Sequence, residues 1–459
     1  MTHLKLAIIG AGPSSFYVAS RLLSLFPQGS ASSQLRVHMY DRLWAPHGLV
    51  RYGVAPDHPE VKNCTHKFDQ TATDSRFRFF GNINIGENPS SLIPHTVHLP
   101  LPSLLSHYTH LLFASGCTVP ILHPALPPSR RTVPALSLVH WYTQHPSRPP
   151  PPALDTVSHV TLIGQGNVSL DIARMLLTSP SILEKYDVPE PVLEVLRRST
   201  VKHVSIVGRR GPLQAAFTMK ELREMMNLTE ASMFPLDASL LTPPVETKLT
   251  RQQSRTLQLL EKGSAHKYGT THKTWSLDFF RSPTGLFPPM PNSASSQLAL
   301  AHTALDSSER AVHTGATSTL DTDLVITSLG QHADPSQAFY DAALGHLRAR
   351  GVLASTMLDA YAVTDTILSD HFPGDMQTTS ATHVPSEGVE YGREIMSTDV
   401  DLESLPREVE DGIRTHEVTE YGQWKTIDAE EVRRGEARGK ERERMGWEEA
   451  QQFLRSKAS

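Results

Sequence analysis

The chain has 459 residues and a formal net charge of −5 at pH 7, with acidic and basic residues mixed along its length. This length allows two or more domains with buried cores, and the charge excludes a general nucleic-acid binder, which needs a basic excess. Only Cys64 and Cys117 are present, which excludes a disulfide framework, a Cys-x-x-Cys redox pair and any cysteine-based zinc or iron–sulfur site.

The first elements along the chain are typical of half of a nucleotide-binding sheet. Residues 4–41 predict a strand, a Gly-rich turn, a helix and a second strand, LRVHMYD, which ends at Asp41. The apolar run HLLFASGC at 110–117 predicts another buried strand of this unit. Pro-rich connections follow at 119–134 and 146–154. Because consecutive prolines cannot donate backbone hydrogen bonds, we expect an exposed linker or loop there.

A second unit of the same kind follows. A strand, a turn and a helix are predicted from Val160, and the next strand is HVSIVGRRG at 203–211. Residues 228–320 carry little pattern, and their Ser/Thr/Gln-rich stretches predict surface loops. The run TDLVITSLGQ at 322–331 predicts a further buried strand. The charged tail from about residue 400 predicts solvated helix and loop.

The first Gly-rich turn lies in LAIIGAGPSSFYVASRLL, residues 6–23. Gly10 allows the sharp bend, and Gly12 lets the backbone approach a pyrophosphate, whose charge the N–H groups of the following helix would meet. The usual third glycine is replaced by Ser15, which is still small. Asp41 ends the next strand, where a carboxylate can bond a ribose 2′-hydroxyl. The alternative is a tight strand-to-helix turn with a surface aspartate.

The second turn, VTLIGQGNVSLDIARMLL at 160–177, repeats this pattern with Gly164 and Gly166. The strand after it ends in Arg209 and Arg210 instead of an acid. Two guanidiniums can hold a phosphate bidentately, and a 2′-phosphate needs cations where a free 2′-hydroxyl needs a carboxylate. The first turn therefore predicts an FAD site and the second an NADPH site. A pair of solvated arginines is the alternative.

Six stretches spread over nearly the whole chain form a set. They are GLVRYGVAPDHPEVKN (48–63), RFFGNINIG (78–86), GQGNVSLDIAR (164–174), GRRGPLQAAFTMKELREM (208–225), SLDFFRSPTG (276–285) and WKTIDAEEVRRGEARGKERER (424–444). In this order the set resembles the adrenodoxin reductase family, the NADPH:ferredoxin oxidoreductases of mitochondria. The first, third and fourth stretches are specific to that family.

The resemblance implies roles for individual residues. FAD is expected to meet Gly10, Gly12, Ser14, Asp41, Leu49 and Ile85. NADP is expected to meet Gln165, Gly166, Asn167, Val168, Arg209, Arg210 and Glu221. His58 and Asp171 match positions that the family places near the flavin as a proton relay. By residue type alone they are more often a loop histidine and a carboxylate on a helix face.

One segment departs from the family. There, a Gly-Trp-Val-Lys type segment leads into Gly-Pro-Thr-Gly-Val-Ile, which lies against the flavin. Here SLGQHADPSQAFYDAALGHLRAR runs directly into GVLASTMLDAYAV, so Gly351, Val352 and Leu353 match the end of that segment, while the Trp and the Gly-Pro-Thr are missing. The pattern indicates a deletion, for which a gene-model or splice defect is one source. A non-catalytic nucleotide-binding variant with an impaired FAD site is therefore an alternative function.

Two nucleotide sites in one chain suit transfer between unlike electron carriers. NADPH gives up two electrons as hydride, a ferredoxin accepts one at a time, and a flavin can do both. The expected function is FAD-dependent electron transfer from NADPH to an adrenodoxin-type ferredoxin. Such ferredoxins are acidic, so a local basic surface would steer them. Candidates are Arg197, Arg198, Lys202, Lys220, Arg251 and Arg255, for which scattered solvated charges are an equal alternative.

The resemblance also implies an architecture and a location. The fold is α/β, with two Rossmann-like dinucleotide-binding domains as in glutathione reductase, and an NADP domain (118–330) inserted into a split FAD domain (1–117 and 331–459). The location is the mitochondrial matrix, with peripheral association with the inner membrane allowed. No run of about twenty apolar residues predicts a membrane span, and no presequence is recognised. A flavoprotein subunit like that of glutamate synthase is a third option, disfavoured by the lack of cysteine-rich motifs.

Overall fold

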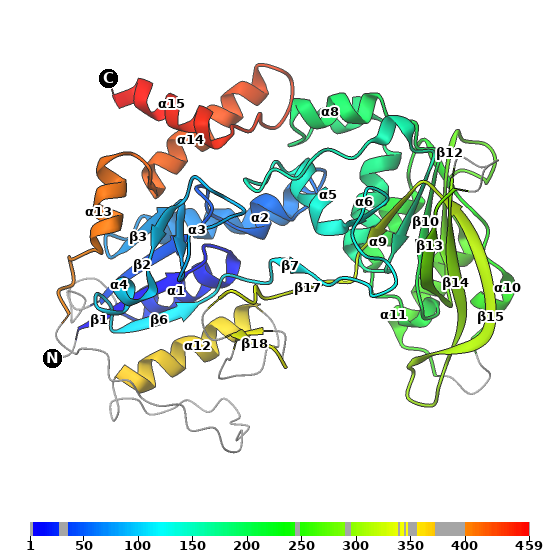
Figure 1. Ribbon diagram of the computed structural model, residues 1–459, viewed down its shortest axis with the longest axis horizontal. Helices are drawn as coiled ribbons and strands as arrows, with labels where there is room; N and C mark the ends of the chain where they lie inside the picture. The colour runs from blue at the N-terminus through cyan, green and yellow to red at the C-terminus, as the bar shows by residue number, and fades with distance from the viewer. Residues whose placement is uncertain are drawn as a thin grey trace.

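The structure is a computed structural model that describes residues 3–26, 35–243, 248–289, 295–337, 340–343, 346–347, 356–371 and 400–458. Two lobes lie side by side, each built around a β-sheet, and two extended strands run between them (Figure 1). Among the helices in these ranges, none combines the length and the hydropathy that a membrane-spanning segment needs.

The sheet of the first lobe has the order β20-β3-β2-β1-β6. Its strands are β1 (Leu4–Ile9), β2 (Leu35–Asp41), β3 (Phe77–Gly81), β6 (His110–Phe113) and β20 (Thr419–Glu420). The first four run parallel, and β20 is antiparallel to β3. The side chains of β1 are buried on both faces, which is typical of the centre of a parallel sheet.

Packed side chains cover both faces of this sheet. On one face, α1 (Pro13–Leu25) packs against α3 (Thr65–Ala72) and α12 (Thr356–His371). On the other, Tyr40 and Phe80 share a core cluster with Leu104 of α4 (Leu101–Leu105) and Val409 of α13 (Arg407–Arg414). The lobe is completed by α2 (Leu49–Tyr52), the 3-10 helix η2 (Pro59–Cys64), β4 (Ile83–Ile85), β5 (Val97–Leu99), β18 (Tyr340–Asp341) and β19 (His346–Leu347).

The sheet of the second lobe has the order β11-β12-β10-β9-β16-β8, and all its neighbours are parallel. Its strands are β8 (Thr132–Pro134), β9 (His159–Ile163), β10 (His203–Val207), β11 (Ala231–Met233), β12 (Lys273–Asp278) and β16 (Leu324–Thr327). Its helices are α5 (Ala135–Tyr142), α6 (Asn167–Leu177), α7 (Pro180–Leu183), α8 (Glu190–Arg197), α9 (Met219–Met226), α10 (Ala238–Leu241), α11 (Arg251–Lys262) and the 3-10 turns η3 (Leu154–Thr156) and η4 (Pro212–Gln214). The strands predicted from Val160, in HVSIVGRRG (203–211) and in TDLVITSLGQ (322–331) are confirmed, and they span 159–163, 203–207 and 324–327.

A three-stranded antiparallel sheet covers the second lobe where surface loops were expected. It consists of β13 (Arg281–Phe287), β14 (Ser296–Leu305) and β15 (Ala311–Thr322). Leu298 and Leu300 of β14 pack on Val207 and Val325 of the parallel sheet. The prediction of loops over 228–320 was wrong, since this range also holds β11, β12, α10 and α11. The sheet was missed in part because most residues of β15 are solvent-exposed, so its apolar alternation is weak. Its threonines nevertheless favour a pleated strand.

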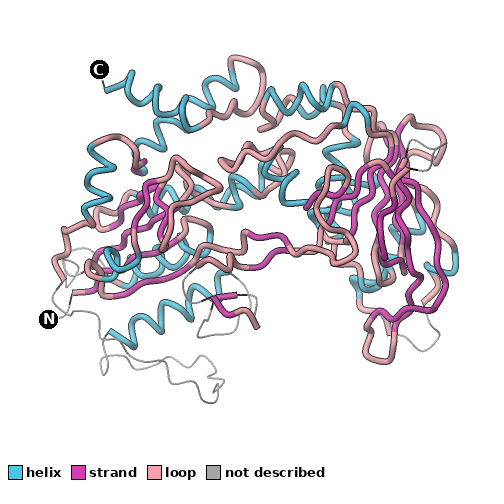
Figure 2. The backbone as a smooth tube through the Cα atoms, viewed as in Figure 1, coloured by secondary structure: helices cyan, strands magenta, loops and turns pink. Residues whose placement is uncertain are grey.

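Two short strands connect the lobes. β7 (Val119–Pro120) leaves the first lobe, and β17 (Gln331–His332) returns from the second. They pair antiparallel, and Figure 2 shows them as the extended segments between the two lobes. The chain therefore enters and leaves the second lobe at one place.

The charged tail is packed, which corrects the prediction of a solvated segment. It forms α14 (Tyr421–Glu436) and α15 (Trp447–Ala458). Trp424 and Trp447 are buried against Trp44 of the first lobe. Several of its charged side chains are also buried, because partners distant in sequence neutralise them. Charge density alone could not reveal those partners.

Candidate functional site

Both Gly-rich turns have the same backbone geometry. The first glycine of each has a φ angle in the left-handed region, +108° at Gly10 and +124° at Gly164. A Cβ atom on Gly10 would lie 2.5 Å from the carbonyl oxygen of Ala114, and one on Gly164 would lie 2.2 Å from that of Ser328. Each turn requires glycine because it presses against the chain that leaves the neighbouring strand of its sheet.

The second glycine of each turn lies at the N-terminus of a helix and faces open space. Gly12 is the N-cap residue of α1, and Gly166 is that of α6. A Cβ atom on either would meet no heavy atom of the described residues within 4 Å. The helix N–H groups can therefore be approached closely by an anion. Both turns fit the pyrophosphate of a dinucleotide.

Asp41 holds the first turn from the end of β2. Its Oδ2 accepts the N–H of Ala11 at 2.6 Å, and its Oδ1 accepts that of Leu43 at 2.8 Å. Burial raises the pKa of Asp41, and these two N–H groups oppose the rise. Both oxygens retain a lone pair for a ribose hydroxyl. Asp41 thus fixes the turn as well as offering an acceptor.

A cavity of about 770 Å³ lies beside the first turn. Gly10, Asp41 and Ile85 line it, together with the loop 86–92 and residues 334–337. This volume is within the range of small-molecule and cofactor sites. The structure therefore brings three of the predicted FAD residues to one cavity.

Leu49 and Ser14 are the other predicted FAD residues next to this turn. Ser14 lies in the first turn of α1 and is exposed. Leu49 follows Gly48, which lies close to the first turn, because a Cβ atom on Gly48 would be 3.1 Å from Cα of Gly12. Leu49 itself is 58% exposed. An apolar ring system stacked on this leucine would gain burial free energy. The residues around the first turn therefore fit FAD.

The second turn is fixed by side chains of its own. Gln165 Nε2 donates to the carbonyl oxygen of Ile206 at 3.2 Å. Asn167 Oδ1 accepts the N–H of Thr218 at 2.7 Å. Val168 is 40% exposed on the first turn of α6. These residues hold an open loop at the carboxyl end of the sheet, which is where ligands bind in such folds.

Arg209 and Arg210 follow β10 at the same edge as the second turn. Their backbone is anchored, since Thr303 Oγ1 donates to the carbonyl oxygen of Arg209 at 2.8 Å and Phe280 N donates to that of Arg210 at 3.3 Å. Both side chains are exposed. The backbone is held while the guanidiniums face solvent, an arrangement that fits a 2′-phosphate and therefore NADPH.

His58, Asp171 and Glu221 meet around one arginine that the sequence interpretation missed. Arg174 Nη2 donates to Asp171 Oδ1 at 2.8 Å, and its Nη1 donates to Glu221 Oε2 at 3.0 Å. His58 Nδ1 lies 3.8 Å from Glu221 Oε1. The two predicted relay residues and the acid predicted for NADP therefore belong to one cluster between the lobes.

Asp57 and Glu224 complete this cluster and were also missed. Arg174 Nε donates to Asp57 Oδ2 at 2.5 Å, and His58 Nε2 lies 2.5 Å from Glu224 Oε2. The available signal was spacing, because Glu221 and Glu224 are three residues apart on one helix, as Asp171 and Arg174 are. Contacts across the lobes carried no such signal.

The charges of the cluster decide what it can do. Burial raises the pKa of Asp171 to about 7, with Glu221 adding to the rise and Arg174 opposing it. His58, Glu221 and Glu224 offer ligand atoms within 4.8 Å of one another. Nη1 of Arg174 lies 3.0 Å from the Glu221 carboxylate and 3.3 Å from the Glu224 carboxylate. Because this cation already neutralises both carboxylates, the cluster does not fit a metal ion.

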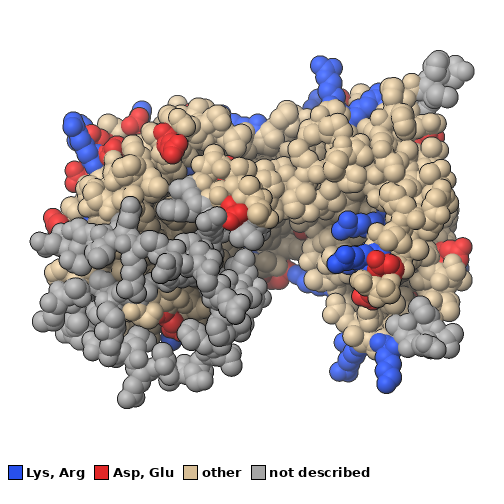
Figure 3. Space-filling view, turned by 60° about the horizontal axis from the view of Figure 1, so that its bottom comes forward, with Lys and Arg blue, Asp and Glu red and all other residues tan. Residues whose placement is uncertain are grey.

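The predicted ferredoxin-docking residues do not form one patch. Lys220 on α9 and Arg251 and Arg255 on α11 lie toward the carboxyl edge of the second sheet, where α11 contacts α9 and the turn η4 after Arg210. Arg198 and Lys202 precede β10 and lie at the opposite edge, as does Arg197, which pairs with Glu190 at 2.5 Å. Figure 3 shows basic side chains standing out from the half that holds this lobe. The remaining predicted residues, Gly351, Val352 and Leu353, lie outside the described residues.

No protein-family model matches the chain. The NADPH:adrenodoxin oxidoreductase, mitochondrial, of Bos taurus is 34% identical over an alignment 483 positions long, which covers 96% of this chain and 90% of that protein. The protein of the same name from Homo sapiens is 33% identical over an alignment 485 positions long, with 96% and 90% covered. The chain belongs to the NADPH:adrenodoxin oxidoreductase family. A shorter match is to the NADPH-ferredoxin reductase FprA of Mycobacterium tuberculosis, which is 40% identical over 232 residues, covering 50% of this chain and 48% of FprA.

Solved structures support the family and its fold. The structure titled Mycobacterium tuberculosis FprA in complex with NADPH has a TM-score of 0.79 and 27% sequence identity to this chain. The match covers 98% of this chain and 99% of FprA. The α/β fold with two dinucleotide-binding units, expected for the NADPH:adrenodoxin oxidoreductase family, is confirmed.

Proposed function

We propose that this chain is an FAD-dependent oxidoreductase that passes electrons from NADPH to a ferredoxin- or adrenodoxin-type iron–sulfur protein. One observation carries the proposal. Two turns of matching geometry occur in one chain. The strand after the first turn ends in Asp41, and the strand after the second is followed by Arg209 and Arg210. The acid suits the ribose of FAD and the arginines suit the 2′-phosphate of NADPH.

The proposal assigns one lobe to each nucleotide. The FAD domain comprises 1–117 and 331–459, and the NADP domain comprises 118–330. The pairing of β7 with β17 supports this division, because the chain crosses at residues 119–120 and returns at 331–332. The place of β20 in the first sheet, more than 300 residues after β3, supports the return of the chain to the FAD domain.

The chemistry of the flavin and the tasks of the protein are separate. Bound FAD would accept hydride and deliver electrons singly to a one-electron carrier. The turns at Gly12 and Gly166 bind the pyrophosphates, and Arg174 orients Asp171 and Glu221 between the lobes. Because its pKa is raised to about 7, Asp171 can hold or release a proton at neutral pH. We assign His58 and Asp171 to that proton exchange.

The comparisons do not support the alternative of a non-catalytic variant. Relatives that match over 96% of this chain are named as oxidoreductases. The cavity beside Gly10 and the exposed Leu49 also favour a retained FAD site. We therefore propose that the chain binds FAD even with the shortened segment before Gly351.

The acceptor and the location follow from the same family. An acidic ferredoxin is proposed to dock near Lys220, Arg251 and Arg255, the half of the predicted basic set that lies at the carboxyl edge of the second sheet. The relatives of Bos taurus and Homo sapiens are mitochondrial by name. We propose a mitochondrial location, in the matrix or peripheral to the inner membrane.

The experiment is reconstitution with flavin. Purified chain is incubated with excess FAD, freed of unbound FAD by gel filtration, and mixed with NADPH and ferricyanide. Retained flavin absorbance and NADPH oxidation are expected. A chain that stays colourless and leaves NADPH intact would refute the proposal and favour the non-catalytic variant.

A further inference from the structure

The segment after α14 crosses from the first lobe to the second. Glu441 N donates to the carbonyl oxygen of Lys185 at 3.1 Å, and Lys440 Nζ donates to that of Val188 at 2.9 Å. Residues 437–446, called here the return segment, therefore lie along the loop 184–189 between α7 and α8. A tail that is part of the first lobe is thereby tied to the nucleotide-binding unit of the second.

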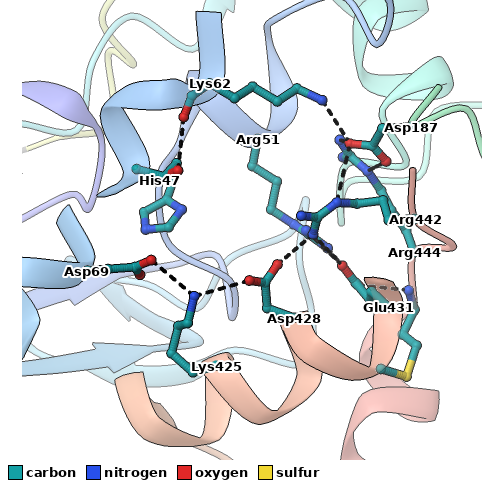
Figure 4. A network of polar contacts seen from close by, with 12 residues as sticks. His47, Arg51, Lys62, Asp69, Asp187, Lys425, Asp428, Glu431, Arg442 and Arg444 are labelled. Carbon is teal, nitrogen blue, oxygen red and sulfur yellow. Dashed lines mark hydrogen bonds and ion pairs between the residues drawn. The ribbon is translucent and has the colours of Figure 1, made fainter. Parts of the chain in front are cut away.

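Asp187 is the centre of this contact (Figure 4). Arg444 binds it bidentately, with Nε to Oδ1 at 2.8 Å and Nη2 to Oδ2 at 2.5 Å. Lys62 of the first lobe donates to Oδ2 at 3.0 Å, and Arg442 Nε lies 3.9 Å away. The side chains of Asp187 and Arg444 are each 2% exposed. We call these four residues the clasp.

The charge of the clasp makes it specific to one geometry. Burial alone would raise the pKa of Asp187, but Arg444, Lys62 and Arg442 hold it well below the usual range. Buried ions lose their hydration and regain free energy only when paired at short, directional distances. A small sliding of one lobe past the other would break the bidentate pair.

A second buried pair extends the clasp into the first lobe. Arg51 binds both oxygens of Glu431, at 2.8 and 3.0 Å, with exposures of 6% and 0%. Arg442 Nη1 lies 3.3 Å from Glu431 Oε2 and donates to Asp428 Oδ1 at 2.5 Å. Met445 N also donates to Glu431, at 2.9 Å. The return segment is thus anchored to Asp187 of the second lobe and to Asp428 and Glu431 of α14.

One stretch of the first lobe serves both the clasp and the candidate site. Residues 49–62 carry Leu49 beside the first turn, Arg51 and Lys62 in the buried ion pairs, and His58 at the Arg174 cluster. Asp57, in the same stretch, pairs with Arg174 of α6. The position of the second lobe against this stretch is therefore set twice, once at Arg174 and once at Asp187.

The path of the return segment is also sterically fixed. A Cβ atom on Gly435 would lie 2.3 Å from Cα of Arg442, so the chain folds back closely on the end of α14. Thr143 follows α5 of the second lobe, and its carbonyl oxygen accepts a hydrogen bond from Arg444 Nη1 at 2.5 Å. Its hydroxyl oxygen lies 2.6 Å from the carbonyl oxygen of Val139 and 3.2 Å from that of Tyr52 in the first lobe. Backbone of both lobes meets at this point.

We propose that Asp187 is a positioning residue for hydride transfer. Through the clasp it sets the orientation of the NADP lobe against residues 49–62, and thereby the distance between the bound nicotinamide and the flavin. The inference rests on the proposed function. Misplacement of reacting groups by about 1 Å can cost roughly a hundredfold in rate, so a looser clasp should slow the chemical step more than it weakens nucleotide binding.

The experiment compares three holoenzyme variants with the wild type. Asp187→Asn removes the central charge and keeps the size, and Arg444→Lys keeps the charge and loses the bidentate contact. Arg433→Met is the matched control, because the Arg433 side chain on α14 is 68% exposed and pairs with Glu430, outside the clasp. The readouts are FAD content, affinity for 2′,5′-ADP, the single-turnover rate of flavin reduction by NADPH, and hydrogen exchange of 49–62 and 184–190.

The expected result separates positioning from folding. In both clasp variants the single-turnover rate falls at least about tenfold and exchange of the two segments rises, while 2′,5′-ADP affinity and FAD content match those of Arg433→Met. Rates equal to the control in both folded variants would overturn the proposal, as would a loss of 2′,5′-ADP affinity that accounts for the whole effect. If the wild type itself does not oxidise NADPH, the proposed function fails. The clasp is then judged by exchange alone, which rises if it holds the lobes and is unchanged if it does not.

Discussion

The coenzyme preference of the second turn gives the sharpest prediction. Replacing Arg209 and Arg210 by alanine removes both exposed guanidiniums after β10 and leaves the turn at Gly166 intact. A hydrogen bond to a charged group contributes about 1.5–3 kcal/mol, and the lower end applies because both side chains are solvated. Two such contacts give about 3 kcal/mol, which corresponds to roughly a 150-fold loss of preference for NADPH over NADH.

The assay is the ratio of kcat/KM for NADPH and NADH, together with calorimetric affinities for 2′,5′-ADP and 5′-AMP. The double variant should lose affinity only for the ligand that carries the 2′-phosphate. Arg198→Ala with Lys202→Ala is the matched control, since these exposed cations lie at the opposite edge of the same sheet. An unchanged preference, or an equal loss for both ligands, would refute the assignment of Arg209 and Arg210.

Three other predictions address the turn, the titration and the buried pair. Gly164→Ala places a Cβ 2.2 Å from a carbonyl oxygen at a φ of +124°, so 2′,5′-ADP affinity should fall at least about tenfold with FAD content unchanged; loss of FAD as well would contradict it. The folded-state pKa of Asp171 is raised from 3.8 to about 7. Its contribution to the free energy of unfolding therefore decreases as pH rises through that interval, by at most about 1.4 kcal/mol per pH unit. Asp171→Asn should flatten this pH dependence in urea unfolding, and an identical slope in the variant would count against the shift. Glu431→Gln leaves Arg51 buried without its charge partner and should lower the free energy of unfolding by about 3–5 kcal/mol. The control Glu448→Gln changes a pair whose two side chains are each 61% exposed, and it should lower the free energy of unfolding by less than about 1 kcal/mol. Equal effects of the two variants would show that burial of the pair is not decisive.

Elements with a strong local pattern could be predicted from the sequence. The strand ending at Asp41 was placed at its observed bounds, 35–41, because the apolar residues Leu35, Val37 and Met39 alternate along it up to a turn. The turns at Gly10 and Gly164 were recognised because only glycine tolerates their positive φ angles against a neighbouring carbonyl. A backbone constraint of this kind can be recognised from the residue type at a single position.

The contacts between the lobes could not be predicted in this way. Arg174 meets Asp57, and Asp187 meets Arg444, across separations of 117 and 257 residues. A charged residue has the same local signature whether it is solvated or buried with a partner, so the tail from residue 400 was taken for a solvated segment. The family resemblance identified His58 and Asp171 as candidates. Only the fold shows that Arg174 connects them, by pairing with Asp171 and with Glu221 beside His58.

Electron transfer from NADPH to a ferredoxin is tested most directly by titrating a ferredoxin with this holoenzyme. Chain reconstituted with FAD is mixed anaerobically with an acidic [2Fe–2S] ferredoxin and a limiting amount of NADPH, and reduction of the cluster is followed by its absorbance. We expect each NADPH to reduce two ferredoxins, because a hydride carries two electrons and each ferredoxin accepts one. NADPH consumed without reduced ferredoxin, or ferredoxin left oxidised beside unreacted NADPH, would contradict it.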